Sequence, residues 1–355
     1  MPSDAQSADS PDDPALKLRG ISAAELLAAE LPARRIILES GRDPILTSKS
    51  LVLLYGPRGV GKTFVALGIA WAAATGGRFL GWQAPKPRRV VYIDGEMAAA
   101  DLRDRLRVFG ETPDTLSFLL GDLHPKSEGL PDLGSLEGQM ALLKQWSGTK
   151  PELLVLDNLA SLVAPRYAPR QAGGDLWRAV QRFLLYLRRN GTAVLVVHHA
   201  DKKGQQRGTS QREDLLDLVL ALRRPSDYAP ADGARFEIHF EKARGLWGDA
   251  VAPIEARLAP DTTTGDAGGT RWQWRPVPRG ELDRVAALLK DGLNPNQIAR
   301  ELGISKSKSY RLRERVVGKA TSNIDSGESA SLCVCAHEPA SSRRKAIGRP
   351  CAQRR

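Results

Sequence analysis

The stretch GPRGVGKT, residues 56–63, decides how this chain is expected to fold. It matches the pattern G-x-x-x-x-G-K-[ST], whose glycines let backbone N–H groups turn inward around phosphate oxygens. The apolar run LVLLY (51–55) precedes it, and residues 63–75 follow with the apolar spacing of a helix. A strand, a glycine-rich loop and a helix in this order place phosphate at the positive end of the helix dipole. The stretch therefore predicts a nucleoside triphosphate site.

The last residues of this loop have separate predicted roles. Lys62 should reach the β- and γ-phosphates, and the Thr63 hydroxyl should hold Mg²⁺. The expected cofactors are ATP and Mg²⁺. The nucleotide contacts are assigned to Gly56, Pro57, Arg58, Gly59, Val60, Gly61, Lys62, Thr63 and Phe64.

Short apolar runs alternate with helical patterns along the body of the chain. Near-continuous apolar strands separated by helices predict a mostly parallel sheet covered on both faces, which is an α/β fold. The expected strands are residues 51–55, 90–94, 116–120, 153–157, 193–199, 218–222 and 235–242. The expected helices lie near residues 23–31, 63–75, 99–109, 136–146 and 176–189.

Acidic residues stand at the ends of two of these runs. Asp157 ends the run LLVLD, and ligands of open parallel sheets bind at the carboxyl ends of the strands. Asp157 is therefore expected to hold Mg²⁺ together with Thr63. The run VVYIDGEM brings Glu96 and Asp94 to the same edge, and hydrolysis needs a carboxylate to orient or deprotonate the attacking water. Glu96 is the candidate and Asp94 the reserve; the alternative is a pair of solvated loop acids.

Two adjacent histidines end the run VLVVHH, residues 194–199. This run is expected beside the strand that carries Asp157. His198 or His199 could contact the γ-phosphate or a bound water from there, and a structural role is the equal alternative.

The segments GPRGVGKT, VVYIDGEM, LLVLDNLA, VLVVHHADKKGQQRGTS and HFEKARG, in this order, resemble the RecA-like ATPases of the plasmid replicative helicase RepA. They are more distantly similar to DnaB-type helicases. The resemblance covers roughly residues 26–257 and implies a RecA-like P-loop NTPase core. It implies that Glu96 is the catalytic glutamate, Asp157 the Walker B acid, and His199 with His198 the sensor element.

The resemblance also implies a homo-oligomer. Lys242 and Arg244 in EKARG have the K-x-R spacing through which DnaB-like enzymes reach the nucleotide of the neighbouring subunit, and Arg207 is a second candidate. A planar guanidinium from the next subunit can stabilise the charge that spreads over the γ-phosphoryl oxygens. This arrangement requires a ring or filament, so a hexamer is expected.

Two basic loops are candidates for contact with DNA in a ring channel. They are residues 163–175 and residues 200–212, and the second contains Lys202 and Lys203. Flexible cationic loops can follow a phosphate backbone without reading its sequence. Ordinary surface loops are the alternative.

Residues 281–316 read as three helices. Asn294 can cap the second helix, Gly303 makes the turn, and Ser305 caps the third. The segment resembles the helix-turn-helix of resolvases and response regulators, which share the pattern Q-I-A-x-x-L-G-I-S. A small all-α DNA-binding module is therefore expected, with a helical bundle for protein contacts as the alternative. The third helix would present to DNA Lys306, Lys308, Ser309, Tyr310, Arg311 and Arg313.

Composition completes the expected domain plan. Residues 1–20 and 319–355 are expected to be disordered tails, 21–260 the ATPase domain, 261–278 a linker and 279–318 the helix-turn-helix module. The formal net charge of +11 and pI of 9.7 favour a polyanionic partner such as nucleic acid.

The compartment follows from what the sequence lacks. No apolar run approaches the roughly 18–20 residues of a membrane span, and the amino terminus does not resemble a signal peptide. The chain is therefore expected in the cytoplasm without a membrane partner. Three functions stay open: a replicative helicase of a plasmid, phage or integrated element, a DNA-bound regulatory ATPase, and a recombination or repair ATPase.

Overall fold

The computed structural model describes residues 20–110, 112–125, 129–146, 148–163, 175–200, 214–260, 270–278 and 280–325. The expected DNA loops at 163–175 and 200–212 fall almost wholly outside these residues, as do the expected tails apart from Gly20 and 319–325. The chain divides into two compact units, Met1–Val277 and Pro278–Arg355. Each unit is described by itself. None of the described helices is long and apolar enough to span a bilayer.

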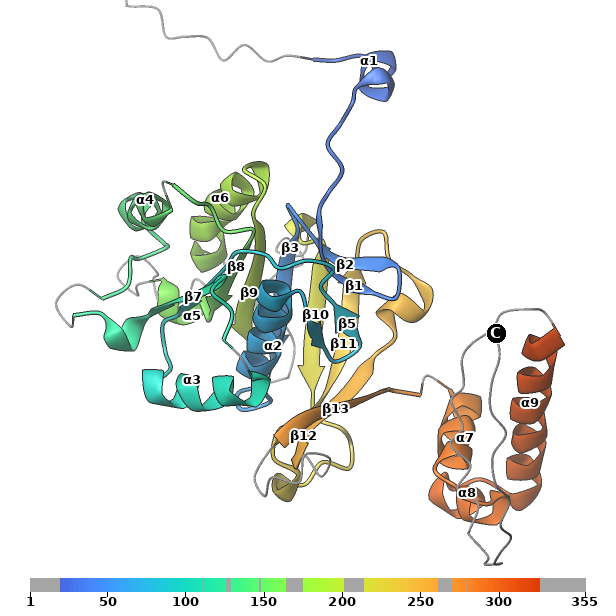
Figure 1. The fold of residues 1–355 in the computed structure, drawn as a ribbon. Helices are drawn as coiled ribbons and strands as arrows, with labels where there is room; N and C mark the ends of the chain where they lie inside the picture. Colours follow the sequence, from blue (N-terminus) through green and yellow to red (C-terminus); the bar gives the residue numbers. More distant parts are fainter. Residues whose placement is uncertain are drawn as a thin grey trace, which may run out of the picture. The chain divides into compact units, whose positions relative to one another are not determined.

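A nine-stranded sheet forms the centre of the first unit, in the order β13-β12-β11-β10-β3-β9-β8-β6-β7 (Figure 1). The strands from β10 to β7 are parallel, and β11, β12 and β13 continue the sheet antiparallel. This mostly parallel sheet confirms the expected α/β class. The parallel strands are β3 (Leu51–Gly56), β6 (Val90–Asp94), β7 (Leu116–Leu120), β8 (Leu153–Asp157), β9 (Ala193–His199) and β10 (Leu218–Arg223). The antiparallel strands are β11 (Arg235–Ala243), β12 (Ile254–Pro260) and β13 (Thr270–Pro276).

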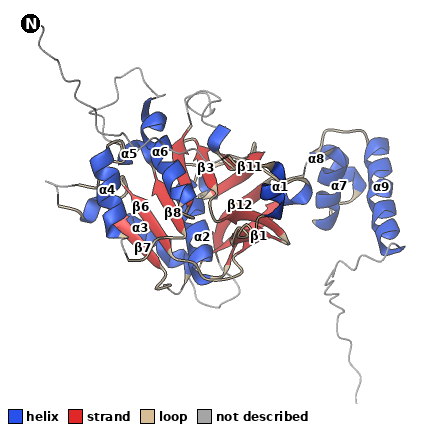
Figure 2. Cartoon of the chain, turned by 90° about the horizontal axis from the view of Figure 1, so that it is seen from above, coloured by secondary structure: helices blue, strands red, loops and turns tan. Residues whose placement is uncertain are grey.

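Helices cover both faces of this sheet (Figure 2). Strand β3 shows why, because its side chains alternate between two separate apolar clusters. Val52 and Leu54 belong to the cluster with α2 (Lys62–Thr75), whereas Leu51 and Leu53 belong to the cluster with α6 (Asp175–Arg189). The other helical segments described in this unit include α1 (Ala23–Ala28), α3 (Ala99–Leu106), α4 (Leu136–Gln145), α5 (Leu159–Leu162), η1 (Arg107–Phe109), η2 (Gly121–Leu123), η5 (Pro230–Asp232) and η6 (Gly248–Val251).

A second, four-stranded sheet was not anticipated from the sequence. Its order is β2-β1-β5-β4. Its strands are β1 (Ile36–Ser40), β2 (Asp43–Thr47), β4 (Arg78–Phe79) and β5 (Trp82–Gln83). These segments are short and only partly apolar, so they give a weak pattern. Ile37, Leu38 and Trp82 nevertheless enter the core beside α2.

The expected linker over 261–278 is wrong for its second half, because Thr270–Pro276 is strand β13 of the main sheet. Aromatic packing explains its position. Trp272 lies 5.6 Å from Phe64 and 5.5 Å from Phe236, measured between ring centroids. The polar residues 261–269 lie outside the described residues.

The described residues of the second unit form three helices, as expected: α7 (Glu281–Lys290), α8 (Pro295–Glu301) and α9 (Lys306–Asp325). The Asn294 side chain accepts hydrogen bonds from the N–H groups of Asn296 and Gln297 and so caps α8. Gly303 has a φ of +63°, which suits the turn before α9. Helix α9 continues past the expected module end at residue 318. Val285, Ile298 and Leu312 form the buried apolar cluster in the described part of the unit.

Candidate functional site

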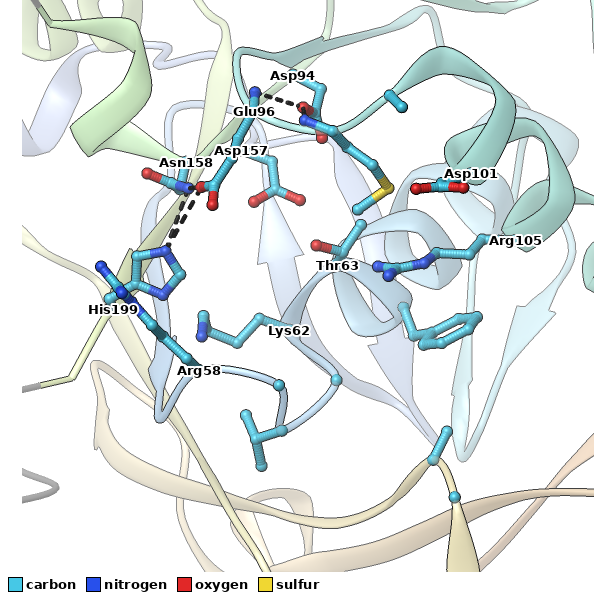
Figure 3. A pocket seen from close by; sticks show the side chains of 18 residues that line it. Arg58, Lys62, Thr63, Asp94, Glu96, Asp101, Arg105, Asp157, Asn158 and His199 are labelled. Carbon is cyan, nitrogen blue, oxygen red and sulfur yellow. Dashed lines mark hydrogen bonds and ion pairs between the residues drawn. The ribbon is translucent and has the colours of Figure 1, made fainter. Parts of the chain in front are cut away.

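A cavity of about 590 Å³ opens at the carboxyl ends of β6, β8 and β9, beside the loop that follows β3 (Figure 3). Three strands place their last residue here, because parallel strands end at the same edge of a sheet. These residues are Asp94, Asp157 and His199. Figure 3 shows the carboxylates of Asp94, Asp157 and Glu96 across the cavity from Lys62.

The glycine-rich loop depends on two glycines with positive φ. Gly59 has a φ of +72° and Gly61 a φ of +115°. A Cβ atom on Gly61 would lie 2.8 Å from the Phe236 ring, so only glycine fits there without a shift. Gly61 also precedes α2 without any side-chain cap. The first N–H groups of α2 are therefore left for a ligand, and anions are the ligands that such a terminus binds.

The ammonium group of Lys62 is held inside the loop. It donates hydrogen bonds to the carbonyl oxygens of Gly56 at 2.9 Å and of Pro57 at 2.7 Å, and the residue is only 6 % exposed. Burial lowers the pKa of Lys62 to about 8, although the charges of Asp157 and Glu96 act in the opposite direction. Most of this lysine is still charged at neutral pH, which a phosphate-binding role requires.

Asp157 is a buried carboxylate at 5 % exposure. The Tyr92 hydroxyl donates a hydrogen bond to it at 2.6 Å, and the Thr63 hydroxyl bonds to it as well. Burial raises the pKa of Asp157 to about 6, and the neighbouring Asp94 adds to this effect. A carboxylate held in this way is stabilised by a cation placed beside it.

Hard cations such as Mg²⁺ bind oxygen ligands, and the Thr63 hydroxyl and Asp157 carboxylate supply two. Among the described residues no cluster of three His, Cys, Asp or Glu side chains could form a complete cage. Mg²⁺ is usually bound by one or two protein oxygens together with substrate phosphates, so this donor set fits it.

Asp94 has a mainly local role. One of its carboxylate oxygens accepts hydrogen bonds from the N–H groups of Glu96 at 2.9 Å and Met97 at 2.7 Å. It is 2 % exposed, and burial raises its pKa. Asp94 therefore shapes the turn that presents Glu96 to the cavity.

Glu96, Asn158 and His199 form a polar group on one side of the cavity (Figure 3). The Asn158 amide donates to the Glu96 carboxylate and lies 3.3 Å from Nε2 of His199. His199 Nε2 is 3.7 Å from the same carboxylate. Burial and the charge of Lys62 lower the pKa of His199, so the contact with Glu96 is made by a neutral ring at pH 7.

The other sequence candidates divide into those at the cavity and those away from it. Arg58, Gly59, Val60, Gly61 and Phe64 line the cavity with Lys62 and Thr63.

His198 does not line the cavity, because strand alternation directs its side chain to the opposite face of the sheet from His199. Lys242 and Arg244 do not line it either, and Arg244 donates to the carbonyl oxygen of Asp214. Lys202, Lys203 and Arg207 lie outside the described residues.

Three polar side chains that line the cavity were missed by the sequence reasoning. Asn158 follows Asp157 directly, but the Walker B pattern does not specify this position. Asp101 and Arg105 lie one turn apart on α3, and the Arg105 guanidinium stands 5.1 Å from the centre of the Phe64 ring. The helical spacing of Asp101 and Arg105 was the available signal.

The third helix of the second unit presents fewer polar side chains than expected. Ser309 was assigned to DNA, and this is wrong, because the residue is fully buried and its hydroxyl donates to the Pro295 carbonyl oxygen at 2.8 Å. Lys308 is half-buried and forms an ion pair with Glu281 at 2.7 Å. The exposed residues on this helix include Lys306, Tyr310, Arg311 and Arg313.

Comparison with known proteins identifies one family. The model of a family described as an AAA domain matches residues 12–205, which is more than half of the chain. No curated protein matches. Among solved structures, the chain is similar to a KaiC-like protein from the hyperthermophilic archaeon Pyrococcus horikoshii OT3, with 16 % identity and a TM-score of 0.46. The match covers 68 % of this chain and 99 % of that chain.

Proposed function

Because the chain belongs to the AAA domain family of P-loop ATPases, we propose that it hydrolyses ATP with Mg²⁺ in this cavity and uses the energy on DNA. One observation carries the proposal. Lys62, Thr63, Asp157 and Glu96 come from three separate segments of the chain and meet around one cavity. This brings a phosphate-binding lysine, a metal-binding pair and a candidate base within reach of one triphosphate.

Each residue has a physical task in this proposal. The N–H groups of the loop and the Lys62 ammonium bind the β- and γ-phosphates. Thr63 and Asp157 would hold Mg²⁺, which neutralises charge on the phosphate oxygens when bound. Glu96 orients or deprotonates the attacking water. The Glu96 side chain is 65 % exposed, and the hydrogen bond from Asn158 restrains its carboxylate. Neutral His199 lines the same cavity and would sense the γ-phosphate.

We place the arginine finger in a neighbouring subunit. Lys242 and Arg244 do not line the cavity of their own subunit, which agrees with a role in trans. Arg207 remains the second candidate. A finger in trans requires a homo-oligomer, and the proposed form is a hexameric ring.

DNA is the proposed partner of the second unit. Exposed Lys306, Tyr310 and Arg311 lie in the first turns of α9, the part of a recognition helix that enters the major groove. With Lys202 and Lys203 proposed to follow single-stranded DNA in the ring, the chain would act as a replicative helicase of a plasmid, phage or integrated element. The separate compact unit also favours a second candidate, a DNA-bound regulatory ATPase that does not unwind.

ATP turnover with and without single- and double-stranded DNA tests the proposal, with Lys62→Ala as the control. Turnover by the wild type, loss of turnover in the variant, and stimulation by DNA are expected. Strand displacement on a forked duplex separates the two candidates, because only the helicase unwinds. Absence of Mg²⁺-ATP binding by the wild-type protein would refute both.

A further inference from the structure

An arginine outside the cavity holds the glycine-rich loop from behind. The guanidinium of Arg224 donates a hydrogen bond to the Gly59 carbonyl oxygen at 3.0 Å. Arg224 directly follows β10, which lies beside β3 in the sheet, and it does not line the cavity. No sequence pattern assigns it a role.

The Arg224 side chain is restrained, although it is exposed. Its guanidinium carbon lies 3.8 Å from the centre of the Tyr228 ring, a close cation–π contact. The Tyr228 hydroxyl in turn donates to the Gly233 carbonyl oxygen at 3.2 Å, and Gly233 lines the cavity. Both ends of this chain of contacts therefore touch the wall of the nucleotide site.

The segment between β10 and β11 is itself braced. Arg235 donates to both carboxylate oxygens of Asp227 at 2.9 Å and to Asp232 at 3.1 Å. Asp227 and Asp232 flank the stretch that holds Tyr228. The bracing limits the positions that Tyr228 can take and so limits those of Arg224.

The geometry of a peptide bond gives the hydrogen bond to Gly59 a consequence. A trans peptide points its C=O and its N–H in opposite directions. Arg224 lies outside the cavity and holds the Gly59 oxygen on that side, so the N–H of Val60 is directed toward the cavity. Gly59 has a φ of +72° and no side chain, so its neighbouring peptides have little else to fix them.

We propose that Arg224 is a positioning residue for nucleotide binding: it fixes the Gly59–Val60 peptide so that an inward N–H is ready for phosphate. The inference rests on the proposed ATP binding and names a residue that acts through the loop without contacting the nucleotide. Without Arg224, part of the ATP binding energy is used to order the loop. The enzyme then binds the substrate and the transition state more weakly by the same amount. KM therefore rises while kcat is unchanged.

Steady-state ATP turnover by the full chain tests this inference. Arg224→Gln should raise KM about tenfold, the size expected for one hydrogen bond to a charged donor, and should leave kcat within about twofold. Arg224→Lys should recover part of the loss because it restores a charged donor. Tyr228→Leu should raise KM by a smaller factor. Calorimetric Kd values for Mg²⁺-ATP should follow the same order.

Arg223→Gln is the matched control. Arg223 is the preceding residue, is also exposed, and pairs with Glu241 at 2.9 Å instead of the loop. The thermal midpoints of both glutamine variants without nucleotide should agree within about 2 °C, since exposed substitutions change stability little.

Two results would overturn the inference: equal KM values for Arg224→Gln and Arg223→Gln, or a fall in kcat at unchanged KM. If the wild type binds ATP and Lys62→Ala does not, the proposed function stands even when the role of Arg224 is refuted. If the wild type does not bind ATP, the proposed function fails, and the role of Arg224 fails with it.

Discussion

Replacing Asp157 by asparagine should make the nucleotide-free protein more stable, although it should abolish Mg²⁺-dependent activity. Asp157 is 5 % exposed, and burial raises its pKa from 3.8 to about 6. The folded state therefore holds the proton more tightly than the unfolded state does. A charged Asp157 is a cost that the protein accepts for function.

The magnitude follows from this shift. A shift of about two pKa units corresponds to a folding penalty of about 3 kcal/mol when the carboxyl is fully ionised. Because Asp157 is almost completely buried, solvent does not screen this penalty. The side-chain oxygen of the asparagine can still accept a hydrogen bond from Tyr92. Its N–H groups reduce the gain in stability by about 1–2 kcal/mol if they lack partners. We expect Asp157→Asn to gain about 1–2 kcal/mol at pH 7.5.

The pH dependence has a definite sign. Above pH 6 the carboxylate is charged in both states, and the full penalty is present. As pH falls from 6 toward 4, the folded state takes up its proton first and the penalty shrinks. The advantage of the asparagine variant should therefore be about 1.4 kcal/mol smaller at pH 5 than at pH 7.5.

Urea unfolding at both pH values, in EDTA and without nucleotide, measures these differences. Glu152→Gln is the matched control, because Glu152 is also buried but pairs with Arg88 at 3.3 Å. That variant should lose stability at pH 7.5. A less stable Asp157→Asn at pH 7.5, or an advantage that does not change with pH, would refute the reasoning. Saturating Mg²⁺-ATP should make the wild type more stable than Asp157→Asn, since only the wild type gains the full binding energy of the ligand.

Three further changes probe other parts of the molecule. Glu96→Gln should leave the Kd for ATP within about twofold and lower turnover about 10²- to 10³-fold in a phosphate-release assay; normal turnover would move the role elsewhere. Gly61→Ala should weaken ATP binding at least about tenfold by calorimetry, because its Cβ atom would meet the Phe236 ring at 2.8 Å and its φ is +115°; unchanged affinity would contradict the steric argument. Deleting residues 278–355 should leave basal ATP turnover within about twofold but weaken duplex binding in fluorescence anisotropy, and equal duplex affinity would dismiss the DNA role of the second unit.

The sequence predicted the parallel part of the sheet because each of those strands is a nearly unbroken apolar run. It did not predict β13, in which Trp272 and Trp274 alternate with polar residues on an edge strand behind the glycine-rich stretch 261–269. The pattern that could have predicted β13 is the pair of tryptophans at alternate positions, but the polar residues around them made it hard to recognise. Antiparallel strands with one exposed face are harder to recognise than buried ones.

The site was predictable where chemistry fixes both residue type and spacing, and not elsewhere. The phosphate loop and the strand-end acids follow such rules. Asn158 does not, because its role depends on how Glu96 and His199 lie across the cavity. Ser309 was wrongly assigned to the exposed face because the first residues of α9 have no apolar spacing that shows which face of the helix is buried. Leu312, one turn later and buried, marks that face and places Ser309 on it.

Strand β11 connects the phosphate loop to the proposed contact between subunits. Near its start, Phe236 packs against Gly61 of the loop. Near its end, Glu241 accepts a hydrogen bond from Tyr55 at 2.6 Å, and Lys242 follows directly. Tyr55 belongs to β3, the strand that leads into the loop, so β11 contacts both the loop and the strand before it. Packed strands resist independent movement. A displacement of the loop on nucleotide binding would therefore reach Lys242 through a rigid element, and this gives a proposed trans finger a physical route for reporting occupancy to the next subunit.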